Sequence, residues 1–448
     1  MVRKAQDIQA AFEVETTYGD APNTELFHLG LLDTFDPRQV EMNITPVPSI
    51  GQSTDAHHAS GPIDVTLPLK VACHGTGWQE LLGNAIGATD IGDDSTDIDV
   101  PHCLTGDTYS HVILAKDLVS DKYTACNGVV VNEATLEADY TAGGYITLDT
   151  ICTAQFSEDS SNGTFTFNPT GGGAMDYNSL AFPNAPSGNP LIPTDLTLSY
   201  STTSDTDALK LTDTAGKYVE IGERYMRFFK EDDNADDEYD GPDSGSSDDA
   251  AIIAEGVVDL DHSNTETLTE LASVLNSAHS GTPAVLGTGA GSYNPQNLLK
   301  GIYKMTGSAV EIPAIADADE DLTSIPNLRT VSLKITNNNI PIPGKIGGKW
   351  LQNKAIARGK ADITLDLEMT GENEDLYDKY VAGATLPLVR LNFGTNGSIA
   401  LTNGTITSFS RPLTGGGEVI DTLSIKFRGN GDYRNYSAFA ISADFTLQ

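Results

Sequence analysis

The chain carries the same β-rich pattern twice. Four segments in its first third match four segments in its last third, and the matches occur in the same order. The pairs are 40–45 with 331–336, 64–71 with 362–369, 127–131 with 403–407, and 141–144 with 414–417. In-order matches of this kind predict an internal duplication, so we expect the two ends of the chain to fold alike.

Each copy predicts the same series of elements. In the first two pairs of segments, apolar residues alternate with polar ones, which is typical of half-buried strands. A long loop separates these two strands, at 46–61 in the first copy and at 337–359 in the second. A short helix and strands joined by glycine-rich turns follow. We therefore predict a mostly β (α+β) fold with two tandem antiparallel β-sandwich modules, each with a flanking helix and a long loop.

The two predicted helices lie near 78–86 and 372–382. The second begins with acidic residues and is followed by Gly383, as the helix dipole and a C′ glycine favour. We expect one apolar side of each helix to face inward. These inward residues are Leu81, Leu82 and Ala85 in the first helix, and Leu376, Tyr377, Tyr380 and Val381 in the second.

The middle of the chain does not take part in the repeat. It opens with sequence rich in Gly, Pro, Asn and Ser, which is typical of a linker. Thr267 and Glu270 later form a capping-box pattern before a helix. Its expected inner face is Leu268, Leu271, Val274 and Leu275. The predicted organisation is a first module at 1–156, an inserted small α/β domain at 157–299 and a second module at 300–448.

The charge of the chain is strongly acidic, with 63 Asp and Glu against 26 Lys and Arg and a net charge of −37. Repulsion on this scale opposes a compact fold in dilute salt. Molar salt shortens the Debye length to about 3 Å and screens the repulsion. The charge favours a protein of a halophilic host, with an acidic protein of an ordinary host as the alternative. Tight DNA binding is disfavoured in both cases, because it requires lysine and arginine patches.

Membrane and thiol signals are weak. The sequence has no run of 18 apolar residues, so no membrane partner is expected. The N-terminal segment has no apolar core or cleavage site typical of a signal peptide, so we expect synthesis in the cytoplasm. Buried free thiols are expected at Cys73, Cys103, Cys126 and Cys152. Cys73-His74 and His102-Cys103 offer four zinc ligands, but their adjacent spacing favours ordinary core and loop residues.

Three segments resemble the major tail tube proteins of long-tailed (siphovirus-like) phages and archaeal tailed viruses. Residues 12–22 (FEVETTYGDAP) are similar to the Glu-x-x-x-Gly-x-Ala-Pro start common in that family. Residues 81–87 (LLGNAIG) resemble its helix ending in small residues. Residues 123–131 (YTACNGVVV) resemble the segment in which Tyr and Cys precede an alternating strand. The resemblance covers about 1–155 and 302–448, and the middle domain has no counterpart in it.

The resemblance implies a structural virion protein of the tail. Six modules of this family form a ring by joining their sheets edge to edge, and the rings stack into a tube through which DNA passes without specific binding. A chain with two fused modules would form a homotrimer ring, with the middle domain as an outer decoration. Edge closure of this kind removes the free strand edges that promote aggregation. The implied partners are copies of the chain itself, the tape measure protein, and the tail terminator and baseplate proteins, assembled in the host cytoplasm.

The predicted loop of the second copy is a basic island in an acidic chain. It carries Lys345, Lys349, Lys354 and Arg358. We expect this loop to dock on an acidic neighbouring ring, since complementary charge sets the register of an encounter. The alternative is a solvated loop in which the charges cluster by chance. The loop of the first copy carries His57-His58 in place of these charges.

An acidic run at 231–249 is the other charged feature. Asp236, Glu238 and Asp240 begin like a calcium loop, but Ser247 stands where a bidentate Glu is expected. A solvated, mobile loop is therefore favoured over a metal site. The five Asn-x-Ser/Thr sequons are attributed to chance.

The sequence lacks the common catalytic motifs, including GxSxG, a Walker loop, HExxH and GxGxxG. We therefore expect no cofactor and no enzyme activity. Two rival functions remain open. One is a virion or cell-surface receptor-binding or glycan-binding protein that uses the middle domain. The other is a glycan hydrolase with paired carboxylates.

Overall fold

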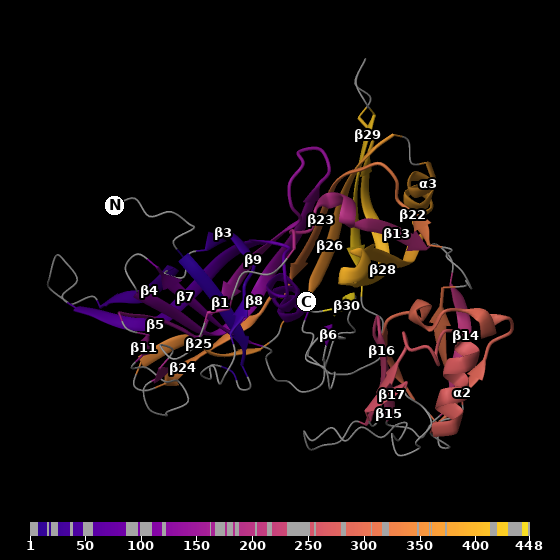
Figure 1. Cartoon of the computed structure of the whole chain (residues 1–448), viewed down its shortest axis with the longest axis horizontal. Helices are drawn as coiled ribbons and strands as arrows, with labels where there is room; N and C mark the ends of the chain where they lie inside the picture. The colour runs from indigo at the N-terminus through magenta and orange to yellow at the C-terminus, as the bar shows by residue number, and fades with distance from the viewer. Residues whose placement is uncertain are drawn as a thin grey trace.

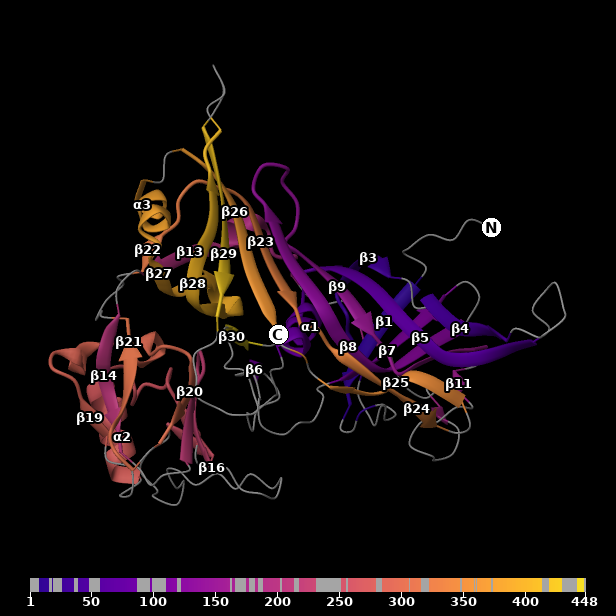
Figure 2. The same ribbon diagram turned by 180° about the vertical axis from the view of Figure 1, so that it is seen from behind.

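The computed structural model describes residues 8–15, 18, 26–35, 39–47, 57–86, 97–98, 110–118, 122–161, 163–165, 175–176, 182–183, 188–201, 204–212, 217–230, 251–254, 257–278, 284–305, 307–315, 322–346, 349–357, 359, 361–371, 374–412, 419–428 and 441–446. Two β-rich modules lie side by side, and a smaller domain is attached to the second (Figure 1). The view from behind shows the same arrangement, with strands of the two modules side by side where the modules meet (Figure 2).

Module 1 is a sandwich of two antiparallel sheets that share one long strand. Its elements are β1 (Ile8–Val14), β2 (Phe27–His28), β3 (Leu31–Phe35), β4 (Gln39–Val47), β5 (His57–Ala72), α1 (Gly77–Ile86), β6 (Asp97–Ile98), β7 (His111–Asp117), β8 (Lys122–Asp139), β9 (Thr147–Thr153) and β10 (Phe156–Ser160). One sheet joins β3 and β4 to β5, then β9 and β8. The other joins β2, β1, β7, β8 and β10. A two-stranded ribbon of β11 (Thr164–Phe165) and β12 (Met175–Asp176) follows.

Module 2 repeats these pairings. Its elements are η2 (Pro193–Asp195), β13 (Thr197–Ser201), β22 (Thr323–Ser324), β23 (Leu328–Thr336), β24 (Ile340–Ile346), β25 (Lys349–Ala357), β26 (Asp362–Thr370), α3 (Glu374–Ala382), β27 (Thr385–Asn392), η5 (Gly394–Asn396), β28 (Ser398–Ser410), β29 (Ile420–Phe427) and β30 (Ile441–Thr446). One sheet joins β23, β26, β29 and β28, and the other joins β22, β13, β27, β28 and β30. The predicted duplication is confirmed.

Equivalent side chains fill equivalent places in the two cores. Phe12 on β1 lies opposite Ile113, and Tyr200 on β13 lies opposite Val389. Both aromatic side chains are almost completely buried. In both modules the alternation of apolar and polar residues places one face of each strand in the core, as the period of two predicted.

Two of the four matches in the sequence have the wrong register. The third is one residue out. Val131 corresponds to Ile406, each just before the bulge of its strand, whereas the match aligned Val131 with Thr407.

The first match is four residues out. Val40 lies opposite Val65, and Ile335 lies opposite Ile363, so Val40 corresponds to Ile335. The sequence match aligned Val40 with Val331, four residues away. A shift by an even number keeps every side chain on the same face, so the alternation could not reveal the error.

The predicted long loop at 337–359 is wrong as a loop, because most of its residues form a β-hairpin. The described residues of the other predicted loop, 46–47 and 57–61, also lie on paired strands. β4 and β5 stay paired as far as Val47 and His57, and β24 pairs with β25 along most of its length. We call these hairpins the arms of the two modules. Prolines such as Pro341 look like strand breakers in the sequence, but they are tolerated on an edge strand such as β24. The arms touch at Ile63 and Leu351, where β5 and β25 pair in parallel.

The middle domain interrupts module 2 between β13 and β22. Its elements are β14 (Asp205–Leu211), β15 (Lys217–Ile221), β16 (Tyr225–Lys230), β17 (Ile252–Ala254), β18 (Val257–Asp259), α2 (Leu268–Ala278), β19 (Ala284–Leu286), η3 (Ala290–Ser292), η4 (Pro295–Asn297), β20 (Gly301–Lys304) and β21 (Val310–Ala314). They form a three-stranded and a five-stranded sheet around a core of their own. We call residues 205–314 the inserted domain.

The predicted boundaries of the inserted domain, 157 and 299, therefore need correction. β10 belongs to module 1 because it pairs with β8, and β13 belongs to module 2 because it pairs with β27. β20 and β21 belong to the inserted domain because they pair with β15 and β14. The sequence repeat did not reveal β13 as the first strand of module 2, because β13 lies more than 100 residues before β22, the next strand of that module.

The helix of the inserted domain is as predicted. The backbone N–H of Thr267 donates to the Glu270 carboxylate at 2.9 Å, and the Glu270 N–H donates to the Thr267 hydroxyl at 3.3 Å. These two bonds complete the capping box. The four residues expected on the inner face of α2 are all buried.

The equivalent helices α1 and α3 have different surroundings. Nine of the ten residues of α1 are buried, whereas Leu376 is the buried residue of α3. Tyr377, Tyr380 and Val381 were predicted to face inward, but they are 40%, 37% and 66% exposed. The prediction was wrong for these three residues because α1 is covered by module 2, while no described element of the chain covers the same side of α3.

Candidate functional site: the seam between modules and the polar face

The two modules are joined through their sheets. β8 of module 1 pairs with β23 of module 2 from Glu133 opposite Thr336 to Asp139 opposite Thr330. The result is one continuous sheet in the order β4, β5, β9, β8, β23, β26, β29 and β28. We call the β8–β23 junction the seam. It gives two strand edges the hydrogen-bond partners that they would otherwise lack.

Helix α1 lies in the seam and packs against both modules. Trp78 of α1 packs against Phe393, which follows β27, with the two rings tilted and their centroids 5.5 Å apart. The amide of Gln79 donates to the carbonyl of Asn396 at 3.3 Å. Both rings of the aromatic pair are buried, and the seam is therefore part of the main hydrophobic core.

A buried asparagine ties the end of β23 to module 1. The amide nitrogen of Asn337 donates to the carbonyls of Ala85 at 2.7 Å and Val131 at 3.0 Å. Asn84 of α1 accepts from the N–H of Val131 at 2.8 Å. These bonds satisfy polar groups that would be costly to leave unpaired in a core. They fix the angle between α1 and the seam.

The continuous sheet has one apolar face and one polar face. The apolar face is in the main core. The described charged residues of the opposite face, which we call the polar face, are Asp64, Lys70, Glu133, Glu137, Asp139, Asp149, Lys334, Asp362, Asp366, Glu368 and Lys426. Serine and threonine side chains lie between them. Carboxylates therefore outnumber lysines on this face.

Each lysine of the polar face is near a carboxylate of the same face. The ion pairs are Lys70 with Glu137 at 3.8 Å, Lys334 with Glu133 at 3.3 Å, and Lys426 with Asp362 at 2.9 Å. The cations are thus partly neutralised by carboxylates of paired strands for Lys334 and Lys426, and by a carboxylate two strands away for Lys70. A surface of hydroxyls and excess carboxylates repels phosphate groups and offers them few cations.

The inserted domain is attached to module 2 by a buried ion cluster. Glu223 is 2% exposed, and its carboxylate lies 2.7 Å from Nε of Arg390 and 3.1 Å from Nζ of Lys300. The Ser398 hydroxyl also donates to Glu223, at 3.0 Å. Burial by itself raises the pKa of the Glu223 carboxyl, but the charges of Arg390 and Lys300 hold it below its usual value.

The attachment lies on the side of module 2 that is opposite the polar face. Arg390 is on β27, and β27 belongs to the second sheet of the sandwich. A small apolar cluster joins Leu388 and Ala400 of that sheet to Leu299 and Ile315. The order of layers is therefore polar face, main core, second sheet and inserted domain. The polar face and the inserted domain are on opposite sides of the molecule.

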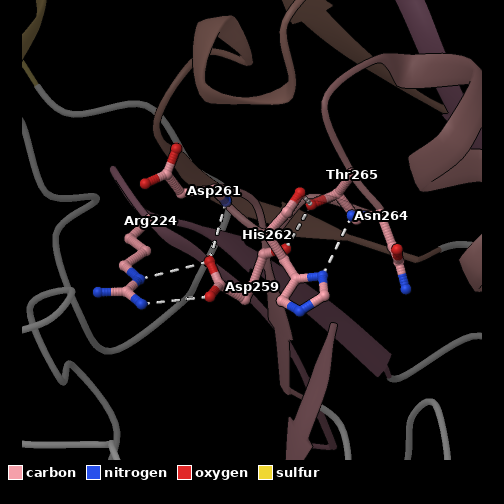
Figure 3. A network of polar contacts seen from close by, with 6 residues as sticks. All are labelled: Arg224, Asp259, Asp261, His262, Asn264 and Thr265. Atoms are coloured by element: carbon pink, nitrogen blue, oxygen red, sulfur yellow. Dashed lines mark hydrogen bonds and ion pairs between the residues drawn. The ribbon is translucent and has the colours of Figure 1, made fainter. Parts of the chain in front are cut away.

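A second polar network shapes the inserted domain itself (Figure 3). The Arg224 guanidinium donates to both carboxylate oxygens of Asp259, at 3.4 and 3.3 Å. Asp259 also accepts from the N–H of Asp261 at 2.9 Å, and the Thr265 hydroxyl donates to the carbonyl of Asp259 at 2.8 Å. Burial and the nearby Asp259 charge raise the pKa of Asp261. The network fastens the turn between β18 and α2, and we assign it a structural role.

The predicted docking residues are only partly described. Lys345 is exposed and lies near the end of the arm, on β24. Lys349 and Lys354 lie on β25 of the same arm, but their side chains are outside the described residues, as is Arg358. The structure brings Lys345 opposite Trp350 in the hairpin. The three lysines thus belong to one arm.

The metal candidates of the sequence lie mostly outside the described residues. This holds for Asp236, Glu238 and Asp240, and for the pair His102-Cys103. Among the described residues, no group of three or more His, Cys, Asp or Glu side chains is placed to hold a metal ion. The described cysteines, Cys73, Cys126 and Cys152, are buried thiols that belong to no disulfide. Burial raises the pKa of the Cys126 and Cys152 thiols to about 12 and that of Cys73 well above its ordinary value.

Sequence reasoning missed the residues that build the seam. Trp78 and Phe393 belong to different copies of the repeat, and nothing in either copy alone shows that they touch. One signal was present. Glu80 is the one charged residue of α1, so a fully buried helix was foreseeable from its composition.

A scan against protein-family models finds no match, and a search of curated proteins finds none either. Among solved structures, the chain is similar to one titled "Tail of empty GTA particle computed with helical refinement, C6 symmetry". The identity is 13%, the match covers 25% of this chain and 85% of the other, and the TM-score is 0.22. A TM-score this low supports no argument about fold or function.

No described helix is both long enough and apolar enough to cross a membrane.

Proposed function

We propose that the chain is a structural protein of a virus tail, the subunit that polymerises into the tail tube. The observation that carries the proposal is the continuous sheet across two copies of one module, joined at the seam. A chain that joins its own modules edge to edge already contains the contact from which a closed ring of modules is built. The resemblance of 12–22, 81–87 and 123–131 to tail tube proteins supports the same function.

In the proposed assembly, three chains form a ring of six modules. The seam is heterologous, because module 1 contributes β8 and module 2 contributes β23. Head-to-tail contacts of this type close into rings when the rotation between units allows it. Ring closure would cover the outer edges of β4 and β28, the two strands at which the described sheet of a single chain ends. A homotrimer would therefore be a pseudo-hexamer.

The polar face would line the lumen of the tube. Its excess carboxylates would keep DNA sliding through the tube without specific binding, because like charges repel the phosphates. The inserted domain would then be on the outside, since it is attached to the side opposite the polar face. This arrangement supports the role of an outer decoration domain.

The arms would connect successive rings. β24 is an edge strand with Ile340 and Ile342 exposed at 59% and 46%, beside the exposed Lys345. An apolar strip with a basic tip suits docking on an acidic neighbour of the same kind. The further proposed partners are the tape measure protein and the tail terminator and baseplate proteins. Assembly would take place in the host cytoplasm, and neither enzyme activity nor a cofactor is part of the proposal.

A receptor-binding or glycan-binding protein of a virion or cell surface is the alternative. The separate core of the inserted domain favours it, because a domain that folds around its own core can carry a recognition surface of its own. The two functions differ in one respect: recognition by the inserted domain does not require the chain to polymerise.

Electron microscopy of the purified full-length chain tests the proposed function. The chain would be incubated from dilute to molar salt, because its net charge of −37 opposes association in dilute salt. The expected result is stacked rings or tubes at high salt, with threefold symmetry at the outer domain. A chain that stays monomeric at every salt concentration would contradict the proposal, and strict sixfold symmetry of the outer domain would exclude the trimer.

A further inference from the structure

One end of the continuous sheet carries an uncovered half of the seam. Helix α3 corresponds to α1, but its Tyr377, Tyr380 and Val381 are exposed. Beside it, Ser408–Ser410 of β28 pair with β29 on one side and with no described strand on the other. In module 1 the same stretch of β8 is paired on both sides, with β9 and β23.

The opposite end of the sheet carries the complementary half. β4 pairs with β5 on one side and with no other described strand. Its counterpart β23 is paired on both sides, with β26 and β8. The turn between β7 and β8 exposes Leu118 at 51%. The corresponding turn of module 2 supplies Phe393, which packs on Trp78 of α1 in the seam.

We infer that a second copy of the chain docks its β4 edge and Leu118 on the α3–β28 end of the first copy, in the register that the seam defines. The inference rests on the proposed function, because it assumes that the chain associates with itself. It goes further by naming the residues that are in contact between two copies. We assign a second copy of the chain to the exposed face of α3, because the seam inside one chain already joins the two surfaces that would meet between copies.

The register follows from equivalent pairings. In the seam, Thr336 lies opposite Glu133 and Ile335 lies opposite Ala134. Glu41 takes the place of Thr336, because Glu41 faces Asp64 as Thr336 faces Asp362. Ser408 takes the place of Glu133, because Ser408 faces Ser424 as Glu133 faces Ile151. Glu41 of one copy therefore pairs with Ser408 of the next, and Val40 pairs with Phe409.

The aromatic side chains at this end suit a contact of this kind. Phe409 lies 5.3 Å from Tyr377 and 6.1 Å from Tyr380, ring centre to ring centre. The edge of β28 and the exposed face of α3 therefore form one continuous surface. Docking would give the β28 edge its missing hydrogen bonds and would bury apolar area of α3 against Leu118, as α1 is buried in the seam.

Cysteine cross-linking in the full-length chain tests the register. The variant Glu41→Cys/Ser408→Cys, assembled in molar salt and mildly oxidised, is expected to form a ladder of chain-to-chain disulfides. Glu41→Cys/Ser410→Cys is the matched control, because a shift of two residues along the strand moves the Cα atoms beyond disulfide reach. Glu133→Cys/Thr336→Cys is the positive control, and its disulfide is expected within one chain because these residues already face each other.

Each outcome separates the two claims. The inference is supported if tubes of Glu41→Cys/Ser408→Cys form the disulfide between chains and tubes of Glu41→Cys/Ser410→Cys do not. Tubes without the Ser408 cross-link, while the seam control oxidises fully, overturn the inference and leave the proposed function standing. A chain that neither assembles nor cross-links between copies at any salt concentration overturns both.

Discussion

Arg411 holds Asp421 by two hydrogen bonds, from Nε at 2.7 Å and from a terminal nitrogen at 2.9 Å, at a place where module 1 has two leucines. The corresponding residues are Leu136 and Leu148, which lie opposite each other on β8 and β9 and are both buried. Arg411 also donates to Glu374 of α3 at 2.7 Å. These partners raise the pKa of Arg411. An ion pair thus replaces an apolar pair at the end of the sheet where β28 has no second described strand beside it.

Removal of Arg411 is predicted to destabilise the chain. Arg411→Ala leaves the Asp421 carboxylate, which is 0% exposed, without its cation. The expected loss in the free energy of unfolding is roughly 2–4 kcal/mol, below the value for a completely buried pair because Arg411 is partly exposed. The double variant Arg411→Leu/Asp421→Leu copies module 1 and is predicted to be within about 1 kcal/mol of wild type. Denaturant unfolding in molar salt measures both, and an equal loss in the double variant would refute this account of the pair.

A charge on the exposed side of α3 is predicted to block assembly without unfolding the chain. Val381 is 66% exposed, so Val381→Glu is expected to change the free energy of unfolding by no more than about 0.5 kcal/mol. Tubes should be absent, because the new carboxylate would be buried against a second copy. Val285→Glu is the matched control, at 57% exposure on the inserted domain. Normal tubes from Val381→Glu, counted by electron microscopy, would show that α3 stays uncovered.

Loss of the Glu223 carboxylate is predicted to loosen the inserted domain. Glu223→Gln leaves the completely buried Lys300 ammonium beside Arg390 with no anion between them. The expected loss in stability is roughly 3–5 kcal/mol. Glu311→Gln, at an exposed ion pair with Lys210, is the control and should cost less than about 1 kcal/mol. Limited proteolysis and denaturant unfolding distinguish the two, and equal sensitivity of both variants would contradict the assigned role.

The same cluster is predicted to make the attachment sensitive to acid. The pKa of Glu223 is depressed in the folded chain, so the carboxylate stabilises the fold above the ordinary glutamate pKa of about 4.3. That stabilisation is lost as the pH falls through the depressed value. Wild type should therefore lose more stability than Glu223→Gln between pH 6 and pH 3, measured by thermal unfolding. Parallel curves for the two proteins would mean that Glu223 does not titrate in this range.

Charge reversal on the arm is predicted to stop tube growth. Lys345→Glu/Lys349→Glu places two carboxylates where the proposed docking requires cations. The domains should stay folded, and assembly should stop at single rings. The neutral variant Lys345→Gln/Lys349→Gln separates loss of attraction from repulsion, and it should give shorter tubes. Tubes of normal length from the Glu variant would remove the arm from the ring contact.

Local pattern was enough to predict much of the fold. The duplication, α1, the capping box of α2 and the buried thiols of Cys73, Cys126 and Cys152 all follow from periodicity and residue type. These features depend on neighbours in the chain. The register of β4 failed for a physical reason, since a shift of four residues keeps Val40 on the same face.

Features that depend on distant contacts could not be predicted. Val381 has the apolar character of a core residue, but it is exposed because no described element of the chain covers its side of α3. β13 pairs with β27 although the inserted domain and several strands lie between them in the sequence. The seam and the Glu223 cluster likewise join residues far apart in the chain, so no local pattern reveals them.

The most direct measurement is a density map of the assembled tube at a resolution that separates strands. The relation between module 2 of one chain and module 1 of the next should superpose on the relation between modules 1 and 2 inside a chain. Glu41 should face Ser408 across the contact, as Thr336 faces Glu133 in the seam. A tube in which neighbouring chains meet through other surfaces, with the β4 and β28 edges still open, would contradict the central claim.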